Sequence, residues 1–187
     1  MKSERQTASS EAPQRHGIDV SRIVLTGFMG SGKTTVGPIV AARMGWNFVD
    51  VDDVIEAEAG CTIAEIFARQ GEVFFRDAEH ATIARLVARA GLVLALGGGA
   101  IERAETRDLL LTAPGTLLVH LEVALATTIK RCKGTEQTRP VLADEANLAK
   151  RYERRLPLYR AAHASIPVDA LTPDEVAEAI LEFLKTS

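Results

Sequence analysis

The chain has 187 residues and a formal net charge of −3, with 47% hydrophobic and 25% charged residues, a size and composition suited to one domain with a buried core. It contains no basic block, so composition gives no support for nucleic-acid binding, and no apolar run approaches the ~20 residues that a membrane-spanning helix needs. The two cysteines, Cys61 and Cys132, fit neither a disulfide framework nor a metal site. We therefore expect a cytoplasmic protein.

The first residues differ in character from the rest. Residues 1–20, "MKSERQTASSEAPQRHGIDV", are polar and lack the apolar stretch of a secretory signal. We expect a flexible N-terminal tail over 1–20, followed by a single domain over 21–187.

Short apolar runs alternate with segments of helical period, which is typical of βαβ units on a parallel sheet. The apolar runs predict strands over residues 22–27, 47–51, 92–97, 116–121 and, more weakly, 164–169. A helix is predicted over 32–44, where Pro38 should introduce a local bend. Two further helices begin with a capping box, formed by Thr62 with Glu65 and by Thr172 with Glu175.

One connection stands out by its length and polarity. Residues 132–145, "CKGTEQTRPVLADE", contain a glycine and a proline and are too long for an idle loop. They predict a mobile lid.

The stretch "GFMGSGKTT" contains the pattern G-x-x-x-x-G-K-[ST], between the first strand and the first helix. This is the context in which backbone N–H groups and a helix N-terminus can bind phosphates. Lys33 supplies a positive charge for the outer phosphates, and the Thr34 hydroxyl can ligate Mg²⁺. We predict nucleoside triphosphate binding. A GTPase of the switch type is disfavoured because no N-K-x-D tetrapeptide occurs in the chain.

Two carboxylates follow the second predicted strand. In "FVDVDD", Asp50 and Asp52 would alternate on one face at the carboxyl edge of the sheet, where ligands of open α/β sheets bind. There they could hold hydrated Mg²⁺ and engage an acceptor hydroxyl. The alternative is that Asp52 or Asp53 caps the following helix.

A triple glycine ends the third predicted strand, at residues 97–99. Glycines are costly to order, so we expect the backbone to approach a ligand closely here; a flexible turn is the alternative. Arginine forks bind carboxylates and phosphates, and four arginines are candidates for such a role: Arg76, Arg131, Arg139 and Arg155. The four histidines show neither a nucleophile partner nor metal-ligand spacing, and we expect surface or strand-packing roles for them.

The sequence resembles the shikimate kinase family from about residue 22 to the C-terminus. The segments that carry the resemblance are "GFMGSGKTT", "FVDVD", "IAEIF", "GEVFFR", "LGGGA", "RPVL" and "RLPLY". The resemblance implies an α/β fold of the P-loop, nucleoside-monophosphate-kinase-like type, with a five-stranded parallel sheet, a substrate-binding subdomain and a lid. It also implies transfer of the ATP γ-phosphate to the 3-hydroxyl of shikimate, with ATP and Mg²⁺, in aromatic amino acid biosynthesis. Such an enzyme would need neither nucleic acid nor membrane, and we expect a monomer.

The resemblance also assigns roles to residues. Asp52 matches the candidate base at the acceptor hydroxyls, and Asp50 matches the carboxylate that holds Mg²⁺ through water, alongside Thr34. The substrate-binding set is completed by Arg76 and Arg155 at the carboxylate, Gly98 through its backbone, and the apolar walls Ile63, Phe67 and Phe75. The ATP-binding set is Gly30, Ser31, Gly32, Lys33, Thr34, Thr35, Arg131 at the adenine and Arg139 from the lid, with Lys33 and Arg139 also catalytic.

Two other functions are weighed against this one. A kinase for another polyhydroxy acid, such as gluconate, is disfavoured by the paired arginines and the "GGGA" segment. A regulatory nucleotide-binding protein without transferase activity would be expected to lack Lys33, Asp52 or Arg139, and all three are present.

Overall fold

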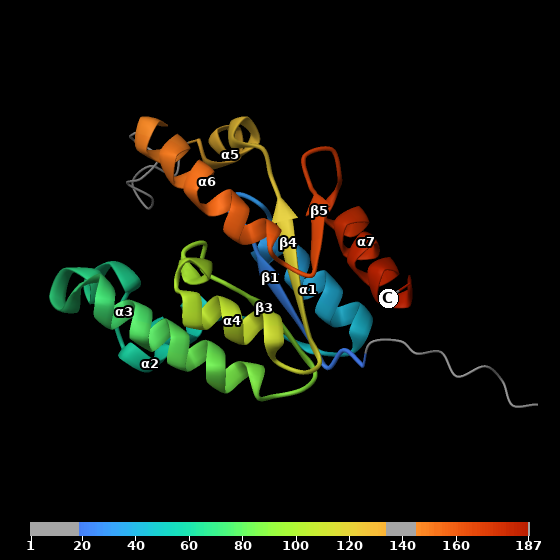
Figure 1. Ribbon diagram of the computed structural model, residues 1–187, viewed down its shortest axis with the longest axis horizontal. Coiled ribbons are helices and arrows are strands. Elements are labelled where there is room, and N and C mark those ends of the chain that lie inside the picture. Colours follow the sequence, from blue (N-terminus) through green and yellow to red (C-terminus); the bar gives the residue numbers. More distant parts are fainter. Residues whose placement is uncertain (1–18, 134–144, 187) are drawn as a thin grey trace, which may run out of the picture.

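Five short strands form one parallel sheet in the order β2-β3-β1-β4-β5. The computed structural model describes residues 19–133 and 145–186 (Figure 1). The strands are β1 (Arg22–Thr26), β2 (Asn47–Asp50), β3 (Leu92–Ala95), β4 (Thr116–Glu122) and β5 (Ala164–Pro167). Each strand predicted from an apolar run is present, and the predicted parallel sheet is confirmed.

Helices connect the strands and cover the sheet. They are α1 (Lys33–Met44), α2 (Val51–Ala59), α3 (Ile63–Val87), the 3-10 turn η1 (Ala100–Glu102), α4 (Ala104–Thr112), α5 (Leu125–Cys132), α6 (Glu145–Arg160) and α7 (Pro173–Thr186). Helix α1 packs against α7, β2 and β3, whereas α4 packs against β4 and α3. Within the described parts of the chain, no helix has both the length and the apolar character needed to cross a membrane.

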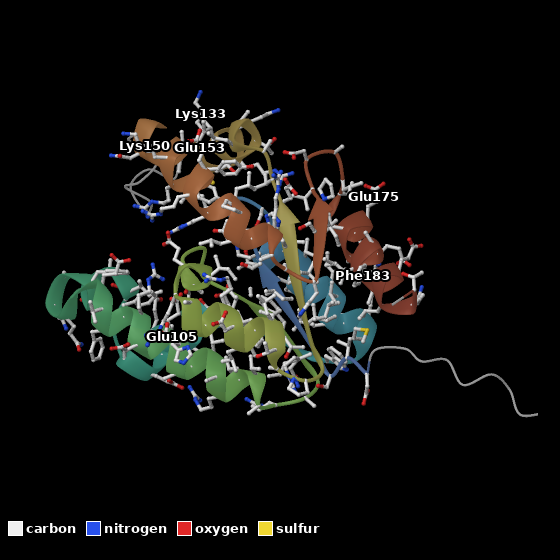
Figure 2. The ribbon with its side chains drawn as sticks, in the orientation of Figure 1. Glu105, Lys133, Lys150, Glu153, Glu175 and Phe183 are labelled. Carbon is white, nitrogen blue, oxygen red and sulfur yellow. The ribbon has the colours of Figure 1, made fainter. Side chains whose placement is uncertain are left out.

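The two predicted capping boxes are present. Thr62 Oγ1 accepts a hydrogen bond from Glu65 N at 3.2 Å, and Glu65 Oε2 accepts from Thr62 N at 2.9 Å. Thr172 and Glu175 make the same reciprocal pair ahead of α7, which Figure 2 marks by Glu175 near its start and Phe183 near its end. These side chains satisfy backbone N–H groups that a helix start leaves without partners.

Helix α1 continues through Pro38 without interruption, so the local bend stays a prediction. The preceding residue, Gly37, is buried against the ring of Phe48 on β2, and a Cβ at this position would overlap that ring. Residue 37 therefore sets how closely α1 approaches the sheet.

Helix α3 consists of two helical segments joined at Gly71, whose φ of 82° and ψ of 174° are not helical. A side chain is strained at such a φ, whereas glycine adopts it readily. The first segment carries Ile63 and Phe67, and the second carries Phe75 and Arg76.

Two predictions extend beyond the described residues. Positions 1–18 of the predicted tail and positions 134–144 of the predicted lid lie outside them. On either side of the second gap, α5 ends at Cys132 and α6 begins at Glu145.

Candidate active site

The glycine-rich loop lies between β1 and α1, at the carboxyl edge of the sheet. Gly32 caps α1 with φ 93°, a left-handed conformation that favours glycine. The Lys33 ammonium donates hydrogen bonds to the carbonyls of Gly27 at 2.8 Å and Phe28 at 3.2 Å. The positive charge thus lies inside the loop, beside the N-terminus of α1, where an anion is favoured.

A cavity of about 610 Å³ opens on this loop. Among its lining residues are the predicted nucleotide residues Gly30, Ser31, Gly32, Lys33, Thr34, Thr35 and Arg131. Asp50, Asp52 and Gly98 line the same cavity. The fold therefore brings the predicted phosphate and acceptor groups into one space.

Asp50 and Asp52 reach the cavity in a different way from the predicted one. The strand ends at Asp50, and Asp52 lies in the first turn of α2, so the prediction that both side chains alternate on one strand is wrong. The helix cap is Asp50, whose Oδ1 accepts from Asp52 N at 3.0 Å, and neither Asp52 nor Asp53 caps it. Capping by Asp50 starts the helix at Val51, two or three residues before the start that a cap at Asp52 or Asp53 would give.

The carboxylate of Asp52 is poorly stabilised in its charged form. Its Oδ1 is buried with no hydrogen-bond partner among the described residues. Burial, and then the charge of Asp50, raise the pKa of Asp52 to about 6. Burial also raises the pKa of Asp50 above its ordinary value. Asp52 can therefore take up a proton near neutral pH, as a general base must.

A third carboxylate, Glu79, lies beside this one. Its side chain is 2% exposed, and Oε2 accepts from Arg76 Nη1 at 2.7 Å. Oε1 has no partner in the described part of the chain. Burial raises the pKa of Glu79 to about 7, although the charge of Arg76 opposes the shift. Glu79 was not among the predicted site residues.

The triple glycine is crowded by these charged groups. A Cβ on Gly97 would lie 2.7 Å from Asp52 Oδ1 and 3.1 Å from Glu79 Oε1. A Cβ on Gly99 would overlap the guanidinium of Arg76. The protein's own carboxylate and guanidinium groups thus lie close to this backbone, and the expected approach of a ligand stays a prediction.

Arg76 from α3 and Arg155 from α6 converge on the triple glycine, at Gly99 and Gly98 respectively. Arg155 is 5% exposed, and its Nη1 lies 3.6 Å from the position that a Cβ on Gly98 would take. The Nε of Arg155 is buried, with no acceptor on any described residue. Two guanidinium groups beside this half-buried backbone suit a carboxylate ligand.

The apolar residues predicted as pocket walls lie next to Arg76. The rings of Phe67 and Phe75 are 4.8 Å apart, and the Arg76 guanidinium is 5.2 Å from the centre of the Phe75 ring. Phe75 is buried, Phe67 is 37% exposed, and Ile63 is half-buried against the core. None of the three lines the cavity at the phosphate loop.

Arg131 bridges two segments that line the cavity at the phosphate loop. Its Nη1 donates to the carbonyl of Gly30 at 3.0 Å and its Nη2 to the carbonyl of Val168 at 3.1 Å. Arg131 lines this cavity, and its contact with adenine stays a prediction. Arg139 lies outside the described residues.

A buried pair of rings, Tyr159 and His120, lies next to the triple glycine. The Tyr159 hydroxyl donates to the carbonyl of Gly98 at 2.5 Å, and its ring stacks on His120 at 5.2 Å. Burial raises the pKa of Tyr159 to about 12 and lowers the pKa of His120 to about 4, so both are neutral at physiological pH. His120 has the strand-packing role expected of it.

Little in the sequence marks Glu79 or Tyr159 as site residues. Glu79 follows Arg76 by three positions, a spacing that places opposite charges together on a helix, and this was the one local signal. Tyr159 acts through a contact 61 positions away along the chain, which no local pattern reveals.

The donors at the phosphate loop fit a magnesium ion bound together with phosphates. Among the residues of known position, no group of three or more His, Cys, Asp or Glu side chains gathers. Mg²⁺ in phosphate-transfer sites is commonly held by one or two protein ligands, phosphate oxygens and water. The Thr34 hydroxyl and the partly buried Asp50, both at the cavity, supply such a pair.

Comparison with protein families gives a match to the shikimate kinase family over residues 29–185. The chain is 41% identical over 165 residues to a shikimate kinase from Moorella thermoacetica, which covers 87% of this chain and 94% of that protein. It is 42% identical over 171 residues to a shikimate kinase from Streptomyces avermitilis, which covers 90% of this chain and 98% of the relative.

Solved structures show the same similarity in three dimensions. A shikimate kinase from Acinetobacter baumannii in complex with shikimate is similar to this chain with a TM-score of 0.83 and 36% identity, over 90% of this chain and 95% of that one. A shikimate kinase from Aquifex aeolicus has a TM-score of 0.73 and 27% identity, over 88% and 96% of the two chains.

Proposed function

The chain belongs to the shikimate kinase family, and we propose that it transfers the γ-phosphate of ATP to the 3-hydroxyl of shikimate, in the route to chorismate and the aromatic amino acids. One observation in the molecule supports a hydroxy acid as the acceptor. Beside the nucleotide cavity, the buried acceptors Asp52 Oδ1 and Glu79 Oε1 and the buried donor Arg155 Nε have no partners among the described residues. A ligand with hydroxyl groups and a carboxylate would satisfy all three.

In the proposed reaction, the oxygen of the 3-hydroxyl attacks the γ-phosphorus, and Asp52 accepts the hydroxyl proton. The bond between the γ-phosphorus and the bridging oxygen breaks, and ADP leaves with that electron pair. Its raised pKa, about 6, suits a base that must be ionised at neutral pH and still bind a proton. Positioning and charge stabilisation carry most of the catalysis in phosphoryl transfer.

The nucleotide phosphates would be held by the backbone of the glycine-rich loop and by Lys33. The Lys33 ammonium donates to the carbonyls of Gly27 and Phe28, and we infer that it exchanges these carbonyls for phosphate oxygens when ATP binds. Thr34 and Asp50 would hold the magnesium ion, which supplies positive charge to the phosphates. The N-terminus of α1 adds its partial positive charge.

The carboxylate of shikimate would be bound by Arg76 and Arg155 beside Gly98 and Gly99. Glu79 would hold Arg76 and face a substrate hydroxyl through Oε1. Phe67, Phe75 and Ile63 would pack against the ring. The protein would act as a cytoplasmic monomer without nucleic acid or membrane.

The test is release of ADP by the purified protein with ATP, Mg²⁺ and a panel of hydroxy acids. We expect rapid turnover with shikimate and only background hydrolysis with gluconate or without an acceptor. Phosphorylation of another acid in preference to shikimate would contradict the proposed substrate. ATP binding without any transfer would favour the regulatory alternative.

A further inference from the structure

Glu102, the last residue of η1, forms ion pairs with two arginines of α6. Its Oε2 accepts from Arg155 Nη2 at 2.9 Å, and its Oε1 accepts from Arg154 Nη2 at 2.5 Å and from Arg154 Nε at 3.0 Å. Burial acts to raise the pKa of Glu102, but the hydrogen bonds and charges of Arg155 and Arg154 outweigh it and lower the pKa. The carboxylate is therefore ionised at neutral pH, with both oxygens engaged.

The ion pair with Glu102 matters more for Arg155 than for Arg154, because the two side chains differ in exposure. The Arg154 side chain is 67% exposed, whereas that of Arg155 is 6% exposed. An exposed ion pair contributes little, but a buried guanidinium depends strongly on its counter-ion. Among the described carboxylates, Glu102 alone lies within ion-pair distance of Arg155.

The pairing also determines how the Arg155 guanidinium is oriented. Nη2 is bonded to Glu102, and Nη1 lies on the side of Gly98, 3.6 Å from the position of a Cβ there. Because the guanidinium is planar and rigid, holding one nitrogen limits rotation of the whole group. Glu102, together with the hydrogen bond between Arg155 and the Tyr159 hydroxyl, thus limits which edge of Arg155 faces the triple glycine.

We propose that Glu102 is a positioning residue for substrate recognition, which holds Arg155 so that Nη1 faces the carboxylate of the substrate beside Gly98. This inference rests on the proposed function, because it takes Arg155 as the ligand of that carboxylate. The opposite effect, competition between Glu102 and the substrate for one guanidinium, is disfavoured because Glu102 bonds Nη2 and leaves Nη1 on the Gly98 side.

The chain offers a matched control for Glu102. Glu122, at the end of β4, pairs with Arg160 of the same helix at 2.5 Å, and the two glutamates are 25% and 22% exposed. The Glu122→Ala change therefore removes a carboxylate of matched exposure that pairs with α6, through an arginine that is 57% exposed, without touching Arg155. An effect due only to loosening of α6 would appear in both Glu102→Ala and Glu122→Ala.

The experiment compares steady-state kinetics of wild type, Glu102→Ala, the isosteric Glu102→Gln and Glu122→Ala. We expect both Glu102 variants to raise KM for shikimate about ten-fold, with KM for ATP and kcat changed less than about two-fold. Glu122→Ala should leave all three values near those of wild type. An unchanged or lowered KM for shikimate in the Glu102 variants, or an equal rise in Glu122→Ala, would overturn the proposal.

A double-mutant cycle tests whether Glu102 acts through Arg155. In an Arg155→Ala background, adding Glu102→Ala should produce no further rise in KM for shikimate, because its target is already absent. A second ten-fold rise would show that Glu102 acts by another route. If the wild type released no ADP with shikimate, the proposed function would fall together with this inference, whereas normal wild-type turnover with unaltered Glu102 variants would reject this inference alone.

Discussion

The guanidinium of Arg76 is bound by the buried carboxylate of Glu79, with Nη1 and Oε2 2.7 Å apart, on the helix that also carries the apolar wall of the proposed substrate pocket. This ion pair does not use both oxygens of the Glu79 carboxylate. Glu79 keeps a second oxygen next to Gly97 that has no partner among the described residues, so that one acid both holds Arg76 and faces the proposed substrate site.

Glu79→Gln should change how stability depends on pH. The pKa of Glu79 is about 7 in the folded protein against an ordinary value of 4.5, so the folded state binds this proton more tightly than the unfolded chain. As pH rises from about 4 to about 8, the free energy of unfolding should therefore fall, by about 3 kcal/mol for this group. Urea unfolding at both pH values should show that the variant lacks this loss. An equal loss in wild type and variant would contradict the raised pKa.

Asp52→Asn should abolish transfer while leaving nucleotide binding in place. The amide keeps the size of the side chain but cannot take the proton of the acceptor hydroxyl, so kcat should fall about 10³-fold. The dissociation constant for ATP, measured by calorimetry, should change less than about two-fold. Retained turnover would remove Asp52 from the role of base.

The pH profile of the wild type should carry the signature of the same carboxyl group. Because Asp52 must be ionised and burial raises its pKa to about 6, kcat/KM for shikimate should rise with pH and level off above that value. A profile that is already flat near the ordinary Asp pKa of 3.8 would show that Asp52 is not the titrating base.

Gly97→Ala should damage the acceptor side specifically. The added methyl group would lie 2.7 Å from Asp52 Oδ1 and 3.1 Å from Glu79 Oε1, so both carboxylates would have to move. We expect kcat to fall about 10²-fold, because small displacements of reacting groups are costly, with ATP affinity and the circular dichroism spectrum preserved. Full activity would mean that these carboxylates need not lie against residue 97.

Gly37→Ala tests the packing that joins α1 to the sheet. A methyl group there would overlap the Phe48 ring, and overpacking of this kind costs about 1–3 kcal/mol. Thermal unfolding should show the lowered midpoint, and a second change, Phe48→Leu, should restore part of it. A variant as stable as the wild type would show that the ring can move aside.

The central strands could be predicted because their signal is local. The runs that became β1, β3 and β4 are buried and apolar along almost their whole length, as parallel strands covered on both faces must be. The end of β2 was misplaced because a capping bond, from Asp52 N to Asp50, outweighs the apolar run. Helices α4, α5 and α6 were not predicted. Helix α6 is strongly polar and contains Pro157, which hid its helical pattern.

The site was predictable where a motif carries its own mechanism, as at Lys33 and Thr34. Glu79, Glu102 and Tyr159 were not predicted as site residues. The ion pair of Glu79 with Arg76 lies within α3, but the approach of Glu79 to Gly97 joins different elements, as do the contacts of Glu102 and Tyr159. Glu102 meets Arg155 across 53 positions of the chain, and Tyr159 meets Gly98 across 61. Such partners become visible only when the sheet has brought η1, α3 and α6 to one edge.

The break at Gly71 divides the proposed substrate pocket between two rigid pieces. The aromatic ring of Phe67 belongs to the segment before the break, and the charged pair of Arg76 and Glu79 belongs to the segment after it. The torsion angles of Gly71 therefore set the separation between Phe67, before the break, and the ion pair of Arg76 and Glu79 after it. Redesign of the proposed pocket for a larger or smaller acid can therefore begin at residue 71, with the residues of the phosphate loop unchanged.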